Sequence, residues 1–431
     1  MLTEIKLTGK EDLGPLGLVD RALNGEVFLI RNALQQFDLM GGLVEASLEG
    51  VRRIAGDEAA RRIEAEGFNH IHKRIPPEDI PAMTEAVYTA VRPVFPAFLR
   101  KFVHKAFPGA TTLYYEESPN IRFHIPFDLA SAHKASFKAF AKSYGEGKIS
   151  AHGPHRDSWL DCPSNSVNLW FAIGPVRKGN GLTIYAEDYG GNFKYKLSGD
   201  IADGEKLRKP LTFDLAPGDC ILFHAEHVHG SELNRTGETR FVISFRMTFD
   251  KPHFPNRQIH RYVSARSIES PLRRFARIPA MLQPSYPRSL IRRGAEKLSL
   301  RKPIDIPAAE PEQIGVEHNG KIRVPLGDVP VGTVRGVSLT LCVARLSATE
   351  AIATTRRCPH NGGDFANGWT EGRKIVCPWH NLPFDASTGR SPCKSLAPVW
   401  RVHCEIVGEE IVVDPARQFC SHEMQSAGTP V

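Results

Sequence analysis

The sequence predicts an α+β, mainly β protein in two parts, in which a β-sandwich or jelly roll with supporting helices precedes a small all-β domain. A helical stretch ends near residue 110, and runs with a period of two then recur from about 111 to 250. From about residue 308 the chain is β-rich again. At 431 residues the chain is also too long for one average core, which favours two domains.

The first 110 residues combine one short apolar run with helical patterns. The apolar run is Val27–Ile30, and helical spacing follows in 43–48 and again in 83–99. Pro76-Pro77 and Pro93 are expected to break these helices, because proline lacks the N–H group that a helix interior needs.

Six β-rich runs follow, separated by turn signals such as Gly179-Asn180-Gly181 and Pro217-Gly218-Asp219. The runs are 111–115, 167–173, 181–185, 211–215, 221–224 and 241–249. Many short strands after a helical layer predict a sandwich or jelly roll with helices covering one sheet.

The chain divides into residues 1–250, a basic proline-containing linker at 251–307, a second domain at 308–415 and a tail at 416–431. From Lys251 to Lys302 there are 13 Lys or Arg against Glu269 and Glu296, an excess of +11, so the rest of the +7 protein carries 7 − 11 = −4. This segment reads as a solvated linker; a surface for an acidic redox partner or anionic lipid is the alternative.

Composition excludes several classes of protein. Charged residues make up 24% and hydrophobic residues 41%, which argues against a disordered chain and an integral membrane protein. The start lacks a signal-peptide pattern and no run approaches about 18 apolar residues, so a cytoplasmic location is expected. The cysteines outside the motif below read as reduced thiols. No nucleic-acid-binding motif is present, and a homo-oligomer is left open.

A metal-ligand motif lies in the C-terminal quarter. Cys358-Pro359-His360 is followed after 16 residues by Cys377-Pro378-Trp379-His380. Two thiolates and two imidazoles at this spacing suit a [2Fe–2S] centre in which Cys358 and Cys377 bind one iron and His360 and His380 the other. A tetrahedral Cys₂His₂ zinc site is the alternative.

Both ligand loops, 358–364 and 377–389, closely resemble those of ferredoxin-type Rieske domains, and the resemblance covers about 308 to 414. Respiratory Rieske proteins carry an extra cysteine in each loop, where this chain has Gly363 and Trp379. The resemblance therefore implies a disulfide-free cluster of lower potential that transfers single electrons. Pro398 matches the proline loop that shields the cluster in the family.

A second metal site is predicted in the front part. In His155-Arg156-Asp157, alternate residues on a strand would point to one face, and His229 is the best third ligand. Two histidines and one carboxylate leave three iron positions open for a bidentate co-substrate and O₂. His227 is a rival to His229. Three other histidines, for which core or surface roles are favoured, are His124, His152 and His224.

The surrounding sequence, from about residue 20 to 250, resembles the phytanoyl-CoA dioxygenase family of Fe(II)/2-oxoglutarate oxygenases. The resemblance is carried by Asn180-Gly181, 217–224, 229–234 and Arg240. The resemblance implies a double-stranded β-helix (jelly roll) that holds Fe(II). It also implies that Arg240, assisted by Ser231, clamps the distal carboxylate of 2-oxoglutarate. Arg246 is a weaker rival to Arg240, and Arg122 could meet the proximal carboxylate or the substrate.

One segment departs from that family. After Asn180-Gly181 many members continue to a Pro-Gly-Ser-His stretch, whereas this chain has Tyr185–Gly190. That loop borders the substrate in relatives. The resemblance therefore does not identify the substrate.

The predicted function is Fe(II)- and 2-oxoglutarate-dependent hydroxylation of a small organic metabolite, with the Rieske domain transferring electrons to the iron site. An external reductase or ferredoxin would supply the electrons, because no reductase motif is present. Desaturation or demethylation stays open, as does a purely structural cluster. The rival functions are a Rieske oxygenase that uses NAD(P)H electrons without 2-oxoglutarate, and a non-enzymatic electron carrier.

Overall fold

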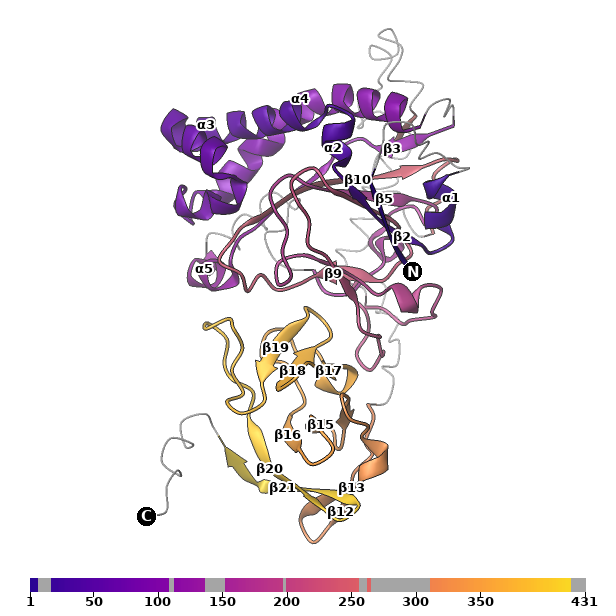
Figure 1. Cartoon of the computed structure of the whole chain (residues 1–431), viewed down its shortest axis with the longest axis vertical. Coiled ribbons are helices and arrows are strands. Elements are labelled where there is room, and N and C mark those ends of the chain that lie inside the picture. The colour runs from indigo at the N-terminus through magenta and orange to yellow at the C-terminus, as the bar shows by residue number, and fades with distance from the viewer. Residues whose placement is uncertain are drawn as a thin grey trace, which may run out of the picture.

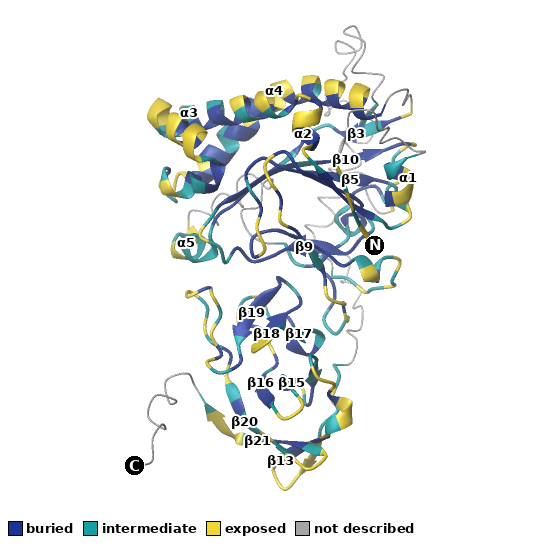
Figure 2. Cartoon of the chain, viewed as in Figure 1, coloured by how far each residue is buried: buried dark blue, intermediate teal, exposed yellow. Residues whose placement is uncertain are grey.

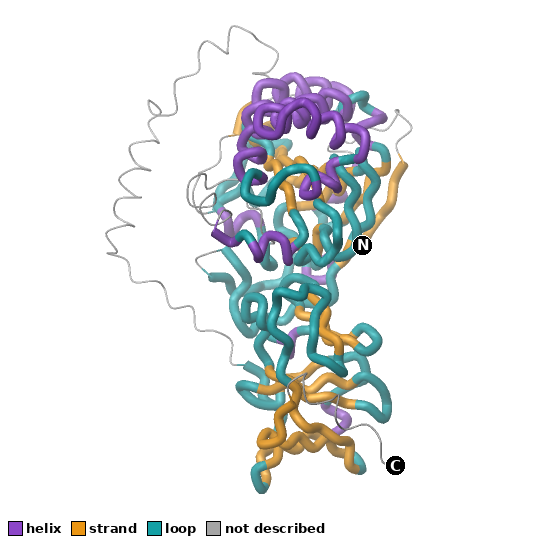
Figure 3. The backbone as a smooth tube through the Cα atoms, turned by 90° about the vertical axis from the view of Figure 1, so that its left-hand side faces the viewer, coloured by secondary structure: helices purple, strands orange, loops and turns teal. Residues whose placement is uncertain are grey.

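The computed structural model describes residues 1–6, 17–107, 112–135, 152–196, 199–255, 262–264 and 311–419. A front body of helices and two sheets and a smaller all-β body lie one after the other along the long axis (Figures 1 and 3). The predicted mainly β fold with supporting helices is confirmed. Most of the basic segment predicted as a linker, and residues 420–431 of the predicted tail, lie outside the described residues.

Two long helices form a layer over one face of the large sheet (Figure 1). Their outer faces are exposed and their inner faces are buried (Figure 2). The helices of the front body are α1 (Leu18–Leu23), α2 (Ala33–Gln36), α3 (Met40–Glu66), α4 (Ile80–Ala106) and α5 (Phe127–Ala132), with the 3₁₀ turns η1 (Phe68–Lys73), η2 (Asp157–Leu160) and η3 (Ala186–Asp188).

The expectation that Pro93 breaks its helix is wrong, since α4 continues through both Pro93 and Pro96. Pro93 lies on the exposed face, where water can satisfy the carbonyl group that its ring leaves without a donor. On the opposite face Phe95, Phe98 and Phe102 are buried against the sheet. Burial of three aromatic side chains outweighs the loss of the two helical hydrogen bonds that Pro93 and Pro96 cannot donate.

The front body contains two sheets. The large sheet has the order β1-β2-β8-β5-β10-β3-β11, and β4 also pairs with β10; the small sheet has the order β7-β6-β9. The strands are β1 (Leu2–Lys6), β2 (Val27–Arg31), β3 (Tyr114–Glu116), β4 (Asn120–His124), β5 (Val167–Ala172), β6 (Leu182–Ile184), β7 (Leu211–Thr212), β8 (Cys220–His224), β9 (His229–Ser231), β10 (Arg240–Thr248) and β11 (Tyr262–Ser264).

Strand β5 shows why the central strands are apolar throughout. Leu169 and Phe171 pack into the core beneath the helices, whereas Trp170 and Ala172 pack into the core between the two sheets. Successive side chains of a strand point to opposite faces, so a strand covered on both faces is apolar at nearly every position. Asn168 is the polar exception, and it is buried.

The C-terminal body has a seven-stranded sheet with the order β12-β13-β21-β20-β16-β15-β14 and a three-stranded sheet with the order β17-β18-β19. Its elements are β12 (Val316–His318), β13 (Lys321–Pro325), β14 (Val334–Gly336), β15 (Leu341–Arg345), β16 (Ala351–Thr355), β17 (Trp369–Thr370), β18 (Lys374–Cys377), β19 (Leu382–Asp385), β20 (Arg401–Val407) and β21 (Glu410–Phe419), with η5 (Leu326–Asp328) and η6 (Phe365–Asn367). The three-stranded sheet is the part nearest to the front body (Figure 1).

None of the helices in the described ranges is both long enough and apolar enough to span a bilayer.

Candidate functional site

Three potential metal ligands meet at one end of the front sandwich. One ligand atom from each of His155, Asp157 and His229 lies within 4.8 Å of the others, and all three side chains are buried. His155 and His229 exchange two backbone hydrogen bonds of 2.9 Å, which fixes the two imidazoles next to each other. The structure thus brings together the three residues singled out in the sequence.

Each histidine of this triad is oriented by a hydrogen bond from its other ring nitrogen. Nδ1 of His155 lies 2.8 Å from the carbonyl oxygen of Gly153, and Nδ1 of His229 lies 2.9 Å from that of His227. A proton on Nδ1 leaves Nε2 free to bind a metal. Burial lowers the pKa of His155 to about 3 and also lowers the pKa of His229, so both rings are neutral near pH 7. The donor set fits a metal ion.

Asp157 is held as a charged carboxylate by two side chains. Arg246 donates to its Oδ1 at 2.6 Å, and Asn168 donates to its Oδ2 at 2.6 Å. Burial opposes ionisation, but the Arg246 charge and the neighbouring His229 lower the pKa of Asp157 overall. Glu116 accepts from the same guanidinium at 3.0 Å, so Arg246 is engaged on both sides. Arg246 is therefore a partner of the triad rather than a second free clamp.

The route by which the sequence places the ligands differs from the expectation. His155 forms only an isolated bridge to His229, and Asp157 begins the 3₁₀ turn η2 instead of continuing a strand. The prediction that strand alternation aligns the two side chains is wrong. The turn brings the carboxylate to the imidazoles because the Asp157 N–H donates to the carbonyl oxygen of Ala225, near the end of β8.

The other candidate histidines take separate places. His224 is tied to Tyr189 and to the carbonyl of Ser164, as expected of a structural residue. His227 is fully buried outside the ligand group, and its carbonyl orients His229. His152 lines the pocket beside the triad, whereas His124 lies at the contact with the C-terminal body.

Arg240 has the free donors that a carboxylate needs. Its Nη1 donates to the carbonyl oxygens of Asn180 at 2.8 Å and Gly181 at 3.0 Å, and lies 3.5 Å from Oγ of Ser231. Its Nε is buried without a hydrogen-bond partner among the described residues. An unmatched buried donor of a guanidinium is costly, so the site favours an oxyanion at this end of the pocket. Trp170 covers one face of the guanidinium at 5.4 Å.

Arg122 supplies a third guanidinium to the same pocket. It projects from β4 opposite Val242, and the described residues give it neither a hydrogen bond nor an ion pair. Burial lowers its pKa, but the charges of Asp157 and Glu116 act in the opposite direction. Three arginines against two carboxylates make the pocket positive, which suits a dianionic co-substrate.

The second group of candidate ligands comes from two loops of the C-terminal body. Cys358 follows β16, Cys377 ends β18, and His380 lies in the turn between β18 and β19. The two thiols contact each other, and the rings of His360 and His380 have centroids 4.7 Å apart. The structure therefore gathers two sulfurs and two imidazoles at one place.

The loops are shaped for a group that carries charge on sulfur. The contact with the Cys377 thiol, and then the backbone N–H groups of His360 and Asn361, lower the pKa of Cys358, although burial opposes them. A Cβ atom on Gly363 would lie 2.8 Å from the sulfur of Cys377, so this position has no room for a side chain. Burial lowers the pKa of His360 to about 4 and of His380 to about 3. The neutral imidazoles and amide-lined thiols fit a [2Fe–2S] cluster.

An ion pair anchors the first of these loops. Arg356 is almost fully buried and binds both oxygens of Asp364 at 2.9 Å. The same side chain donates to the carbonyls of Glu312 and Ser338. Bidentate pairing of this kind fixes both the position and the orientation of Asp364 in the loop.

The cluster loops face the front body directly. The backbone N–H of Leu233 donates to the carbonyl of His380 at 3.0 Å, and the Tyr185 hydroxyl donates to the carbonyl of Pro378. The ring of Phe127 meets that of His360 edge-on at 5.2 Å. His380 is consequently buried, whereas His360 keeps part of its surface.

The segment that departs from the family pattern now has an explanation. Tyr185 is fully buried at the junction between the two bodies, and Tyr189 donates its hydroxyl to the carbonyl of Leu23 at 2.7 Å. This loop thus packs against the C-terminal body and against α1. The two tyrosines of the loop make these contacts, and the contacts do not depend on which residues border the substrate.

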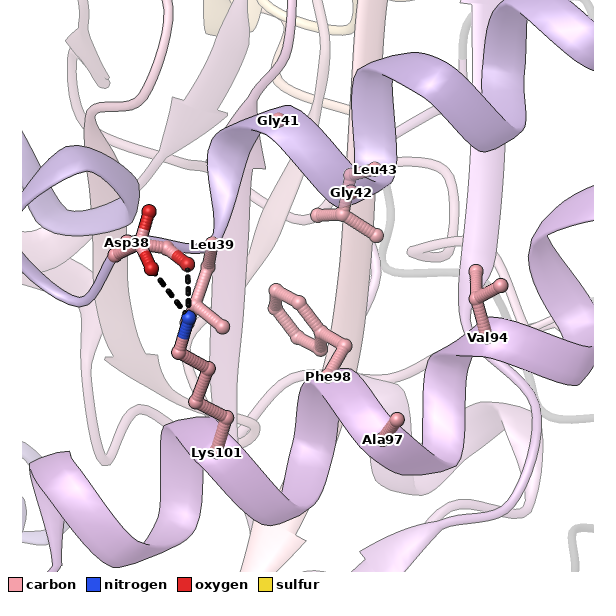
Figure 4. Close-up of a pocket in the computed structure, with 9 residues that line it drawn as sticks. All are labelled: Asp38, Leu39, Gly41, Gly42, Leu43, Val94, Ala97, Phe98 and Lys101. Carbon is pink, nitrogen blue, oxygen red and sulfur yellow. Dashed lines mark hydrogen bonds and ion pairs between the residues drawn. The ribbon is translucent and has the colours of Figure 1, made fainter.

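A separate groove of about 380 Å³ opens between the start of α3 and the middle of α4 (Figure 4). An ion pair of Asp38 and Lys101 at 2.5 Å closes one side. It contains no pair of potential metal ligands. Its remaining lining residues are Leu39, Gly41, Gly42, Leu43, Val94, Ala97 and Phe98.

Two protein-family models match the parts of the chain that contain these residues. The Rieske [2Fe–2S] domain model matches residues 317–399, and the phytanoyl-CoA dioxygenase (PhyH) model matches residues 124–242. The ferredoxin component of the naphthalene 1,2-dioxygenase system of Pseudomonas aeruginosa is 34% identical over 93 residues, which cover 21% of this chain and 86% of that protein. Through this region the chain belongs to the Rieske family. A ferredoxin component of naphthalene 1,2-dioxygenase/salicylate 5-hydroxylase systems from Ralstonia is 37% identical over 73 residues, 16% of this chain and 70% of that protein.

The front body is PhyH-like, and it carries all three triad residues within the matched range. Among solved structures, the epimerase SnoN in complex with Fe³⁺, alpha ketoglutarate and nogalamycin RO is 15% identical, over 55% of this chain and 84% of that chain, with a TM-score of 0.30. Similarity at this level is too low to carry a functional conclusion. The Rieske domain and the PhyH-like domain are the names used below for the two bodies.

Sequence reasoning missed several residues of the site. Asn168 and Glu116 orient Asp157 and Arg246, and the only signal for Asn168 was a polar residue in an apolar strand. Glu232 and Asn381 lie inside the motifs that were read, yet their mutual contact at 3.0 Å joins segments 149 positions apart. Such contacts have no signature in either segment alone.

Proposed function

We propose that the chain is a non-haem Fe(II)- and 2-oxoglutarate-dependent oxygenase that hydroxylates, or otherwise oxidises, a C–H bond of a small organic metabolite. Its Rieske domain passes electrons to the iron site. The observation that carries the proposal is the buried triad beside Arg240, whose Nε has no partner among the described residues. The domain limits that we propose remain 1–250 for the oxygenase, 251–307 for the linker and 308–415 for the Rieske domain.

In this proposal His155, Asp157 and His229 hold the iron, which supplies the open positions for O₂ and a 2-oxo acid. Arg246 and Asn168 keep Asp157 charged and fixed. The two hydrogen bonds that Nδ1–H donates to backbone carbonyls keep the imidazoles in the tautomer that offers Nε2.

Arg240 binds the distal carboxylate of 2-oxoglutarate through Nε, because Nη1 is already held by two carbonyl groups. Ser231 adds a hydroxyl at the same end of the pocket. Arg122 meets the proximal carboxylate or an anionic part of the substrate, since it is the guanidinium left without a partner among the described residues.

Cys358, Cys377, His360 and His380 hold the [2Fe–2S] cluster, which supplies single electrons. The junction supports a role toward the triad, because Leu233, which bonds to His380, lies four positions after His229. His380 is buried there, so an external reductase or ferredoxin approaches the cluster from the side of His360. The cytoplasm, with such donors, is the proposed location.

The test has two measurements on protein purified without oxygen. Roughly three irons and two inorganic sulfides per chain are expected, from one cluster and one mononuclear site. Adding 2-oxoglutarate to the Fe(II) protein should produce a weak metal-to-ligand charge-transfer band that an Asp157→Ala variant lacks. Zinc without labile sulfide would contradict the cluster, and absence of the band at saturating 2-oxoglutarate would contradict the oxygenase class.

Electron transfer to the iron is tested by succinate formation over repeated turnovers with and without a reducing partner. A His380→Ala variant that has lost the cluster should inactivate faster than the wild type when the partner is present. Equal inactivation rates in the two proteins would leave the Rieske domain a structural role.

A further inference from the structure

One buried carboxylate lies between the two sites. The Glu232 side chain has no exposed surface. Its Oε2 accepts hydrogen bonds from the backbone N–H groups of Gly179 at 2.6 Å and Gly181 at 3.3 Å. Its Oε1 accepts from Nδ2 of Asn381 at 3.0 Å and from Nη1 of Arg235 at 3.4 Å. Each oxygen therefore holds a different part of the molecule.

On the side of the triad, Oε2 fixes the 179–181 turn, which holds the side chain of Arg240. The carbonyls of Asn180 and Gly181 in this turn hold Nη1 of Arg240, and Gly181 also accepts the backbone N–H of Glu232 at 3.0 Å. Gly179 has a φ of +104°, a left-handed conformation that favours glycine. The direction of the Arg240 fork thus depends on a turn whose N–H groups end on Glu232.

On the other side, Oε1 fixes the cluster loop next to its ligand. Asn381 directly follows His380 and adopts a φ of +53°, which asparagine tolerates better than most residues. Arg235 donates to the Asn381 carbonyl at 3.1 Å, and Leu233 donates to the His380 carbonyl at 3.0 Å. The backbone around His380 is therefore held by the segment that contains Glu232.

The 179–181 turn is thus connected to the cluster loop through Glu232. Removing a buried carboxylate with several donors costs more than removing an exposed one, because the donors have no water to replace it.

We propose that Glu232 is a positioning residue that couples the 2-oxo acid site at Arg240 to the Rieske cluster loop at Asn381. The coupling rests on the proposed function, since it requires Arg240 to bind the carboxylate and His380 to hold the cluster. A carboxylate on the Arg240 fork neutralises the guanidinium and changes the hydrogen bonding of the 179–181 turn. Glu232 transmits that change to Asn381 and so to the surroundings of His380.

Thermodynamic linkage makes the coupling reciprocal. If a bound 2-oxo acid shifts the reduction equilibrium of the cluster, then reducing the cluster changes the affinity for the 2-oxo acid by the same factor. We expect about a fivefold change in affinity, which for one electron corresponds to a shift of about 41 mV in the cluster potential.

The experiment uses the full chain with its cluster and with redox-inactive Zn²⁺ at the triad, so that only the cluster titrates. The midpoint potential is measured with and without N-oxalylglycine, an unreactive 2-oxo acid analogue, and its affinity is measured for both cluster states. The variants are Glu232→Gln and Asn381→Gly, because glycine removes the amide donor and tolerates the positive φ at this position. The matched control is Asp128→Asn, because Asp128 also joins the two domains, by accepting the N–H groups of Lys394 and Ser395, but does not touch the turn.

The wild type and the Asp128→Asn protein should show the shift, whereas Glu232→Gln and Asn381→Gly should lose it while still binding N-oxalylglycine. Asn381→Gly leaves Glu232 with its other donors, so it keeps the test valid if Glu232→Gln does not fold. A full shift in Asn381→Gly, or no shift in a wild type that binds the analogue, overturns the coupling alone. A wild type that does not bind N-oxalylglycine contradicts the proposed function instead.

Discussion

The two candidate metal sites are built in opposite ways. The four ligands of the Rieske loops lie between positions 358 and 380, and backbone N–H groups surround their sulfurs. The triad ligands span 155 to 229, and Asp157 is fixed by Asn168 and Arg246 from two other strands. A closed electron-transfer site can be assembled from local loops, whereas an open catalytic site needs side chains from distant strands to set its charge.

The largest expected effect is the loss of one site without the other. Cys377→Ser should abolish the visible cluster absorption and the labile sulfide, because the hairpin turn then lacks one of four ligands. The triad should keep its metal, since its ligands lie in another domain. Cys404→Ser, a partly buried thiol outside the motif, is the control. Simultaneous loss of triad metal in Cys377→Ser would show that the two sites are not independent.

Substitution of two arginines should separate 2-oxoglutarate binding from metal binding within the triad pocket. Arg240→Ala should weaken 2-oxoglutarate binding by roughly 2–5 kcal/mol, because the buried carboxylate loses its charged partner, and should leave metal affinity nearly unchanged. Arg246→Ala should instead weaken metal retention, since Asp157 loses its hydrogen bond at 2.6 Å. Both quantities can be measured by titration calorimetry. The opposite pattern would exchange the roles of the two arginines.

The sequence predicts the parts of this molecule that are set by local pattern. The six β-rich runs match six observed strands to within about a residue, apart from the shorter β7 and the shifted β3, because apolar alternation and turn residues are local. The runs did not include β1, β4, β9 or β11. Pro93 was misjudged because burial of the opposite face of α4 decides the outcome. The ligands in His155-Arg156-Asp157 were identified for a wrong reason, since Asp157 reaches the site through a 3₁₀ turn.

The junction between the domains could not be predicted. Tyr185, Leu233 and Asp128 bind groups more than 140 positions away, and their neighbours in sequence do not distinguish these contacts from ordinary burial. Tyr185 is a partial exception, because the sequence there departs from the family pattern. That departure indicated that the surroundings of the loop differ from those in relatives, but it did not indicate which part of the molecule the loop contacts.

The pH dependence of the free energy of unfolding should distinguish the buried triad histidine His155 from an exposed histidine. In protein that keeps its cluster but lacks the triad metal, His155 has a pKa of about 3, below its usual 6.5. Above pH 6.5 neither state binds the proton; below it the unfolded chain binds a proton that the folded site does not. Stability is therefore lost as pH falls from about 6.5 towards 3, by up to about 1.4 kcal/mol per pH unit for this residue.

Urea unfolding of the PhyH-like domain at pH 7, 6 and 5 measures this effect. His155→Gln should reduce the pH dependence, whereas the exposed His104→Gln should not. Restoring the triad metal should increase the loss on acidification, because protons then compete with the metal for the ligands. Identical slopes in wild type and His155→Gln would mean that the site is open to water in the folded state.

The smallest effects are expected at the rim of the domain junction. Lys206 pairs with Glu312 at 2.9 Å, but the lysine side chain is 55% exposed, so Lys206→Ala should change stability by no more than about 1 kcal/mol, and less in high salt. Tyr185→Phe, at the buried centre, leaves the carbonyl of Pro378 without its donor and should cost about 1–3 kcal/mol. The effect of both substitutions is measured by the hydrogen-exchange rates of the backbone amides in 377–382. Faster exchange in Tyr185→Phe at all salt concentrations, with little change in Lys206→Ala, is the expected pattern. The reverse would mean that the rim charges, rather than the buried contacts beside His380, hold the Rieske domain on the PhyH-like domain.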